Sequence, residues 1–322
     1  MATRNDLIAL AHRHLSDVEL RPFLLYAEAL DTAITGQVIV DLPRPIGALD
    51  DTAPPAEQLA WHTLSEERGS VWAAARSVVQ LLRWDTDPRA FANGRSFTLG
   101  LFAKGGLRGL TRSTQYHANV CRLLNHMVSD VLPLHEWTSL TLTLDDMCEP
   151  YVDRGNREGR SLLVGLSNHD QGGIWIASQD GGGFAEVGDT IYAGDVFQTS
   201  AKAVTFDAKR CLHSTCNWTG GNRIVMIAYC VAHFAALPAN LRSLGKRLRA
   251  LGFATWPQLA AEATERLGSN LSLARLGTRA FVCAAHRDAF SGIPRTIGTA
   301  VLDVDKERAT PVAALDCREP SA

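Results

Sequence analysis

The clearest pattern in the chain is a series of short segments, between about residues 97 and 231, in which hydrophobic and polar residues alternate. At 138–144 threonine and leucine alternate, which places Leu140, Leu142 and Leu144 on one face of a predicted strand. Short strands at regular spacing predict a β-sandwich or a barrel. Further β-rich runs, divided by Gly, Asp and Asn, lie at 161–166, 174–178, 195–199, 203–206, 212–216 and 223–231.

Hydrophobic residues at helical spacing lie on both sides of this β-rich region. They predict helices at 6–31, 57–84, 114–132, 241–251 and 256–267. A proline-rich loop is predicted at 41–55, and an irregular tail from about residue 293. We therefore expect an α+β protein with three parts: a helical bracing region at 1–92, a β core at 93–236, and a helical extension with a tail at 237–322.

Composition narrows the classes of partner. The 322 residues are 46% hydrophobic and 20% charged, and the formal net charge is -2. That balance creates no general field for a membrane surface or a nucleic acid, so nucleic acid is not favoured as a partner but stays open. Three arginines that follow Asp153 closely in the sequence could accept an anionic substrate: Arg154, Arg157 and Arg160.

The cysteine content and the hydropathy of the chain predict its cellular compartment. The seven cysteines form an odd, scattered set, which indicates a reducing compartment rather than a disulfide framework. No apolar run approaches the roughly 20 residues of a membrane span, and the first residues do not resemble a secretory signal. The expectation is a soluble intracellular protein, cytoplasmic or nuclear, without membrane association.

The candidate site consists of polar residues at the ends of predicted strands. Tyr151 and Asp153 are two residues apart, so on a strand both point to the same face, towards the mouth of a barrel. His213 follows far downstream, and Arg223 comes soon after it, across a turn at 217–222. A hairpin of that length lets the histidine and the arginine project into one cavity.

An ordered set of short motifs surrounds these residues. The motifs are Leu99-Gly100-Leu101, Gly105-Gly106, Asp153 with Asn156, Gly172-Gly173-Ile174-Trp175, Phe206-Asp207 with His213, and Gly221-Asn222-Arg223. In this order they resemble the double-stranded β-helix core of the 2-oxoglutarate/Fe(II) dioxygenase superfamily, and are most similar to a group of algal and retroelement-associated reading frames. The resemblance covers about 97–253, roughly half the chain.

The resemblance implies a jelly-roll core flanked by helices, with Fe(II) and 2-oxoglutarate as cofactor and cosubstrate. It implies that Asp153 and His213 are iron ligands and that Arg223 pairs with the far carboxylate of 2-oxoglutarate, which suits the planar guanidinium fork. The implied reaction is a hydroxylation-type oxidation. The sequence does not identify the substrate, which could be a small molecule or a polymer.

The chain departs from the family pattern where the first iron-binding histidine is expected, because Tyr151 stands there. A phenol, with a reference pKa of about 10, must lose its proton before it binds a metal, and a phenolate favours ferric iron. Two hypotheses follow. Either the chain is an oxygenase, with Tyr151 or the nearby His169 as third ligand, or it is a catalytically degenerate relative that acts as a binding or structural module.

Each candidate residue also has a purely structural interpretation. Asp153 could cap a turn, His213 could be packed in the core, and Arg223 could lie on the surface. Tyr151 could be a packed aromatic residue, and His169 could lie on an exposed turn. A zinc site at Cys211, His213 and Cys216 is not expected, because a strand would direct Cys216 away from the other two.

Overall fold

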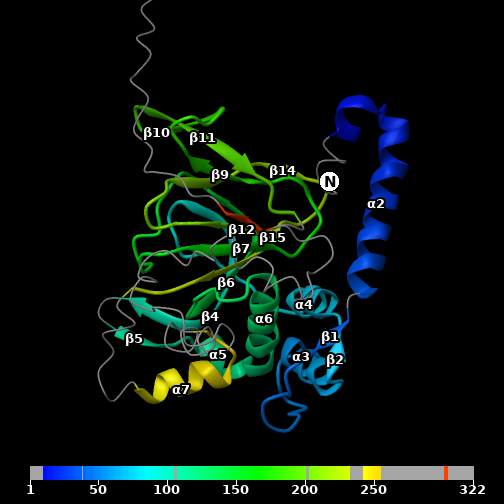
Figure 1. Cartoon of the computed structure of the whole chain (residues 1–322), viewed down its shortest axis with the longest axis vertical. Coiled ribbons are helices and arrows are strands. Elements are labelled where there is room, and N and C mark those ends of the chain that lie inside the picture. The colour runs from blue at the N-terminus through cyan, green and yellow to red at the C-terminus, as the bar shows by residue number, and fades with distance from the viewer. Residues whose placement is uncertain are drawn as a thin grey trace, which may run out of the picture.

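The protein is built in three layers. The computed structural model describes residues 10–37, 39–104, 107–200, 203–232, 242–254 and 301–303. Helices cover one face of a larger sheet, and a smaller sheet lies over the opposite face (Figure 1). The chain is thus a mixed helix-and-sheet protein, whose mainly antiparallel sheets curve around the space between them.

The larger sheet contains the strands that the alternating pattern predicts. All its pairings are antiparallel except the pairing of β16 with β12. Its order is β16 (Val301–Asp303), β12 (Ala203–Phe206), β7 (Ser161–Gly165), β15 (Ile224–Tyr229), β6 (Ser139–Cys148), β4 (Ala92–Lys104) and β3 (Asp85–Thr86), with β5 (Leu107–Leu110) paired to β4.

The smaller sheet is also antiparallel. Its order is β10 (Gly183–Val187), β11 (Thr190–Phe197), β9 (Ile174–Ala177) and β13 (His213–Thr215). Two short pairs lie outside both sheets, β1 (Val40–Asp41) with β2 (Arg68–Gly69), and β14 (Trp218–Thr219) with β8 (Asp170–Gln171). From β6 onwards the chain moves repeatedly between the larger and the smaller sheet.

Two hydrophobic clusters hold the layers together. On β7, Leu162 and Val164 face the helices while Leu163 faces the smaller sheet, as the period of two in a strand requires. Both faces of β7 are buried, which explains why its sequence is a nearly continuous run of apolar residues. The helix-side cluster draws on α3 (Pro55–Ser65), α4 (Val71–Gln80), α6 (Ala118–Val131) and α7 (Arg242–Ala250).

The helix boundaries differ from three predictions. The helix predicted at 57–84 is divided into α3 and α4, because Glu67 adopts a positive φ of 59° and Ser70 caps the second helix through Ala73 N. The helix predicted at 114–132 is divided at His117 into α5 (Arg112–Tyr116) and α6. The helix predicted at 6–31 is interrupted near Ser16, where a new helix begins.

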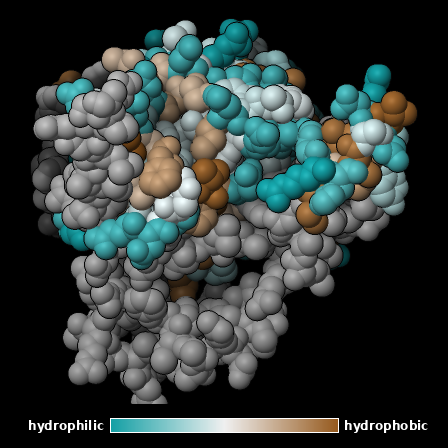
Figure 2. Space-filling view, turned by 90° about the horizontal axis from the view of Figure 1, so that it is seen from above, coloured by the Kyte–Doolittle hydropathy of each residue, from teal (hydrophilic) through white to brown (hydrophobic). Residues whose placement is uncertain are grey.

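The N-terminal helix and the C-terminal tail also depart from expectation. After the interruption, α2 (Asp17–Gln37) stands beside the sheets (Figure 1) and forms the protrusion at the right of Figure 2. It exposes Val18, Leu25 and Tyr26. Within the predicted irregular tail, residues 301–303 form a strand, whereas the helix predicted at 256–267 lies outside the described residues. Among the described helices, none is both long and apolar enough to cross a membrane.

Candidate functional site

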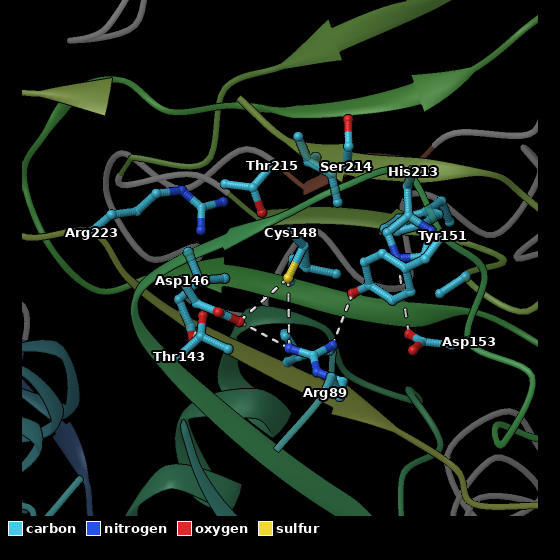
Figure 3. Close-up of a pocket in the computed structure, with 16 residues that line it drawn as sticks. Arg89, Thr143, Asp146, Cys148, Tyr151, Asp153, His213, Ser214, Thr215 and Arg223 are labelled. Carbon is cyan, nitrogen blue, oxygen red and sulfur yellow. Dashed lines mark hydrogen bonds and ion pairs between the residues drawn. The ribbon is translucent and has the colours of Figure 1, made fainter. Parts of the chain in front are cut away.

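One pocket between the two sheets brings the predicted site residues together. Tyr151, Asp153, His213 and Arg223 all line it (Figure 3). Its cavity volume is about 40 Å³, which is room for a few water-sized groups. The sequence therefore predicted which residues meet, while the roles assigned to them stay predictions.

Strand pairing places three of these side chains. Tyr151 and His213 form an antiparallel bridge, in which Tyr151 N donates to His213 O over 2.9 Å and His213 N donates to Tyr151 O over 3.0 Å. Two residues on, Asp153 N donates to Ala208 O. The bridge fixes the tyrosine and the histidine next to each other, and the alternation of the extended backbone directs Asp153 to the same side.

His213 presents a neutral ring nitrogen to Asp153. Its Nδ1 lies 2.9 Å from Cys211 O, and because a carbonyl only accepts, Nδ1 carries the proton and Nε2 keeps a lone pair. Nε2 lies 4.0 Å from Asp153 Oδ2. Burial lowers the pKa of His213 to about 4, and burial raises the pKa of Asp153 to about 6, an effect that Arg89 partly offsets.

Tyr151 is packed as an aromatic residue. Its ring stacks on Phe91 at 4.4 Å between centroids and lies against His213 at 4.3 Å. Its hydroxyl oxygen accepts a hydrogen bond from Arg89 Nη1 over 3.2 Å. Burial, and secondly the charge of Asp153, raise the pKa of the phenol above its usual range, so Tyr151 is neutral at physiological pH.

Arg223 is a buried cation at the start of β15. Only 3% of the residue is exposed, and its guanidinium points into the pocket (Figure 3). Nε donates to Gly172 O over 2.8 Å, and the ring of Trp218 lies 5.9 Å from the guanidinium carbon. Within the described part of the chain, no carboxylate lies within ion-pair distance of Arg223. Burial lowers its pKa to about 10, so it remains charged.

Three further pocket residues were not predicted from the sequence: Arg89, Asp146 and Cys148. A bulge in β6 exposes two of them to the pocket. Arg95 of β4 pairs with Leu144 and Asn93 with Met147, so two steps along β4 match three along β6. Asp145, with φ of 49°, absorbs the extra residue.

The bulge reverses which residues of β6 face the pocket. Before it, Thr143 faces inwards; after it, Asp146 and Cys148 do. Strict alternation would have turned both towards the helices. The local signal was the acidic pair Asp145 and Asp146, which interrupts the Thr/Leu pattern, opposite Gly94, the one residue type that fits against the bulged backbone.

Arg89 reaches the pocket from the segment between β3 and β4, within the region predicted only to brace the core. Its Nε and Nη2 each lie 2.9 Å from one carboxylate oxygen of Asp87. Nη2 also lies 2.9 Å from Asp146 Oδ2, and Nη1 donates to Tyr151. In Figure 3 Asp146 lies between Arg89 and Arg223. Burial raises the pKa of Asp146, and Arg89 opposes this rise.

A complete three-ligand iron site is not formed by these residues. Asp153 and the Nε2 of His213 are suitable donors, but the third position holds a neutral phenol that accepts a hydrogen bond from a cation. Across the described ranges, no group of three His, Cys, Asp or Glu side chains could hold a metal ion. The residues therefore do not fit an iron centre of the facial-triad type.

His169 does not replace the missing ligand, and its predicted exposure is wrong. Only 2% of the residue is exposed, and it is not among the residues that line the pocket. Its Nδ1 lies 3.2 Å from Ser167 Oγ, and its ring packs against Gly172. The loop after β7 folds inwards here because Ser200 Oγ accepts from the backbone N–H of His169.

The arginines considered for an anionic substrate do not line this pocket. Arg157 forms a forked ion pair with Glu136, in which Nη1 lies 2.8 Å from Oε1. Arg160 Nη1 lies 3.5 Å from Thr205 O. Of the three arginines, Arg157 thus has its charge neutralised by Glu136 of the same chain.

Comparisons with known proteins give distant structural similarities. No family model and no curated protein matches the chain. An oxidoreductase of the 2OG-Fe(II) oxygenase family from Burkholderia pseudomallei has a TM-score of 0.30 and 12% identity, covering 46% of this chain and 71% of that one. A prolyl-4-hydroxylase from Pseudomonas putida has a TM-score of 0.29 and 12% identity, covering 62% and 96%.

A third similar solved structure contains bound ligands. HygX from Streptomyces hygroscopicus, with nickel, 2-oxoglutarate and hygromycin B bound, has a TM-score of 0.29 and 14% identity, covering 66% of this chain and 92% of that one. At these scores and identities the similarity does not assign a family or an activity to this chain. The predicted closeness to algal and retroelement-associated proteins stays a prediction.

Proposed function

We propose that this protein binds a small carboxylate at Arg223, with 2-oxoglutarate as the first candidate ligand, and that it is a non-catalytic relative of the oxygenases. We infer that its core is a double-stranded β-helix. The order of the strands supports this: β6, β7, β12 and β15 belong to the larger sheet, and Tyr151, β9, β11 and β13 to the smaller.

The observation that carries the proposal is the state of Arg223. A buried charge is expensive unless it is paired and hydrogen-bonded. Arg223 is 3% exposed, lines the pocket between the two sheets, and has no carboxylate partner within the described residues. A carboxylate ligand would supply the missing charge, and the planar guanidinium would bind it through two parallel hydrogen bonds. At about 40 Å³, the pocket has room for a compact group such as one carboxylate of a ligand.

The ligand set at the metal position favours binding over oxidation. The third ligand position holds a neutral, packed Tyr151, so the described residues do not supply a complete set of donors for Fe(II). Asp153 and His213 then act as polar groups of the pocket wall, 4.0 Å apart.

Isothermal titration of 2-oxoglutarate in the presence of a chelator tests the proposal. The expected result is metal-independent binding that weakens at least about 30-fold in Arg223→Met, since a buried charged hydrogen-bond pair contributes roughly 2–5 kcal/mol to binding. Arg157→Met is the matched control, because this arginine lies in an ion pair outside the pocket and its loss leaves the affinity unchanged. Equal binding to the native protein and to Arg223→Met would refute the proposal.

One observation favours a second candidate, an active 2-oxoglutarate/Fe(II) oxygenase with two protein ligands. His213 is neutral, and the lone pair on its Nε2 lies near the Asp153 carboxylate. Anaerobic Fe(II) titration followed by measurement of succinate release separates the candidates. Tight iron binding and succinate release by the native protein would establish the oxygenase, whereas iron binding confined to Tyr151→His would support the non-catalytic relative.

A further inference from the structure

We infer that Arg89 keeps divalent metal ions from binding between Asp153 and His213, so that the missing histidine is not the sole barrier to metal binding. The inference deepens the proposed function, because it takes these two residues as what remains of a metal site. It assigns to Arg89 a role in selecting what the pocket binds: an organic anion rather than a metal cation.

The position of Arg89 is fixed by its partners. Two carboxylates hold it, Asp87 through two hydrogen bonds and Asp146 through one, all at 2.9 Å. Its guanidinium also lies over the rings of Phe91 and Tyr151, 5.3 Å and 5.5 Å from their centroids. Since these contacts come from several elements, the guanidinium cannot swing away to make room for a second cation.

The charge of Arg89 acts on the same groups that a metal would need. Arg89 lines the same pocket as Asp153 and His213, and its guanidinium carbon lies 5.5 Å from the ring centroid of Tyr151, whose ring packs against that of His213. A divalent ion between these residues would be repelled by the guanidinium, and the repulsion is weakly screened in a buried pocket. Nη1 also donates a hydrogen bond to the phenol oxygen of Tyr151, so a metal ion at that oxygen would have to displace the guanidinium.

This arrangement predicts that restoring the histidine alone gives only part of the possible metal affinity. In Tyr151→His the third ligand is present, but the guanidinium, held by Asp87 and Asp146, still lies beside the site. Metal affinity should therefore rise fully only when the charge at position 89 is removed as well.

Titration with Co(II), read by calorimetry and by the visible absorption of the bound ion, tests the inference. The variants are Tyr151→His alone and Tyr151→His with Arg89→Met and Asp87→Asn, where the second change neutralises the carboxylate left without its partner. We expect the combined variant to bind Co(II) at least about tenfold more tightly, a change of about 1.4 kcal/mol. Removing a carboxylate by itself weakens metal binding, so the added Asp87→Asn cannot produce this gain.

Two matched variants separate charge from other effects, and circular dichroism with thermal unfolding checks that each is folded. Tyr151→His with Arg89→Lys keeps the positive charge, so its Co(II) affinity should stay near that of Tyr151→His. Tyr151→His with Arg157→Met should do the same, because Arg157 lies outside the pocket. If Tyr151→His alone reaches the full affinity, or if lysine at 89 gives the same gain as methionine, Arg89 has no such role. Because no 2-oxoglutarate is added, failure of carboxylate binding at Arg223 would not affect this result.

Discussion

Two arginines share the pocket and differ in how their charge is neutralised. Arg89, in the pocket wall, donates to Asp87, Asp146 and Tyr151. Arg223, on the opposite side of Asp146 in Figure 3, donates through Nε to one backbone carbonyl and has no carboxylate partner among the described residues. Among the described residues, the chain therefore supplies carboxylates for Arg89 but none for Arg223.

The difference shows how the same residue type acquires two roles. A guanidinium that is paired with carboxylates of the chain stabilises the fold and sets the local charge. A guanidinium that is buried without its counter-ion costs stability in the absence of a ligand, and gains most when a ligand binds. Partners, rather than burial alone, distinguish the two.

The largest effect is expected when each arginine is replaced in turn by methionine and the two changes in stability are compared. Arg89→Met should lower the free energy of unfolding by about 3–5 kcal/mol, because it leaves Asp87 and Asp146 without their cation. Arg223→Met should change stability little or raise it, because an unpaired buried charge is removed. Urea unfolding followed by circular dichroism measures both. Similar losses in the two variants would mean that Arg223 has a partner within the chain.

Changing the bulge that presents Asp146 gives the next largest effect. An alanine Cβ at position 94 would lie 2.3 Å from Asp146 Cα and 2.6 Å from Asp145 O, both of them backbone atoms. Gly94→Ala should therefore cost about 1–3 kcal/mol in urea unfolding, as overpacking does, and should weaken 2-oxoglutarate binding.

The control for this change is Gly155→Ala. Gly155 follows the pocket residue Asp153 in the chain, but no atom lies within 4 Å of its added Cβ. It should leave both the unfolding free energy and the affinity unchanged. An unaltered Gly94→Ala protein would show that β6 relaxes without moving Asp146.

The smallest effect is expected from Tyr151→Phe. The variant keeps the ring contacts with Phe91 and His213 and removes only the neutral acceptor of Arg89 Nη1. It should cost about 1 kcal/mol in urea unfolding, the usual contribution of one hydrogen bond. A loss of 3 kcal/mol or more would indicate that the phenol is ionised and forms an ion pair with Arg89, contrary to its raised pKa.

Much of the β core could be predicted because both faces of its central strands are buried. The run at 203–206 coincides with β12, and that at 161–166 contains β7. His213 and Arg223 could be placed in one cavity because they lie in the predicted runs at 212–216 and 223–231, whereas Asp153 was placed there by its spacing from Tyr151 and by the family resemblance. Helix boundaries were less predictable, since a single backbone conformation, as at Glu67, ends a helix without altering the hydrophobic period.

The missed residues lie where periodicity gives no information. Asp146 and Cys148 face the pocket only because one extra residue at the bulge reverses the alternation. Arg89 lies in a short connection without regular structure, and only the fold brings it beside Tyr151, far away in the sequence. His169 was misjudged for a related reason, because a turn-like sequence gives no sign that its loop packs inwards.

The origin of Arg89 has a consequence for how this pocket can evolve. The charge at the pocket is set partly by the connection between β3 and β4, which precedes the other strands that line the pocket. On the role inferred for Arg89, substitutions at 87 or 89 combined with Tyr151→His would change whether the pocket favours an anion or a cation. Most of the strand sequence around the pocket would stay the same, so unchanged strands do not by themselves preserve the kind of ligand that the pocket binds.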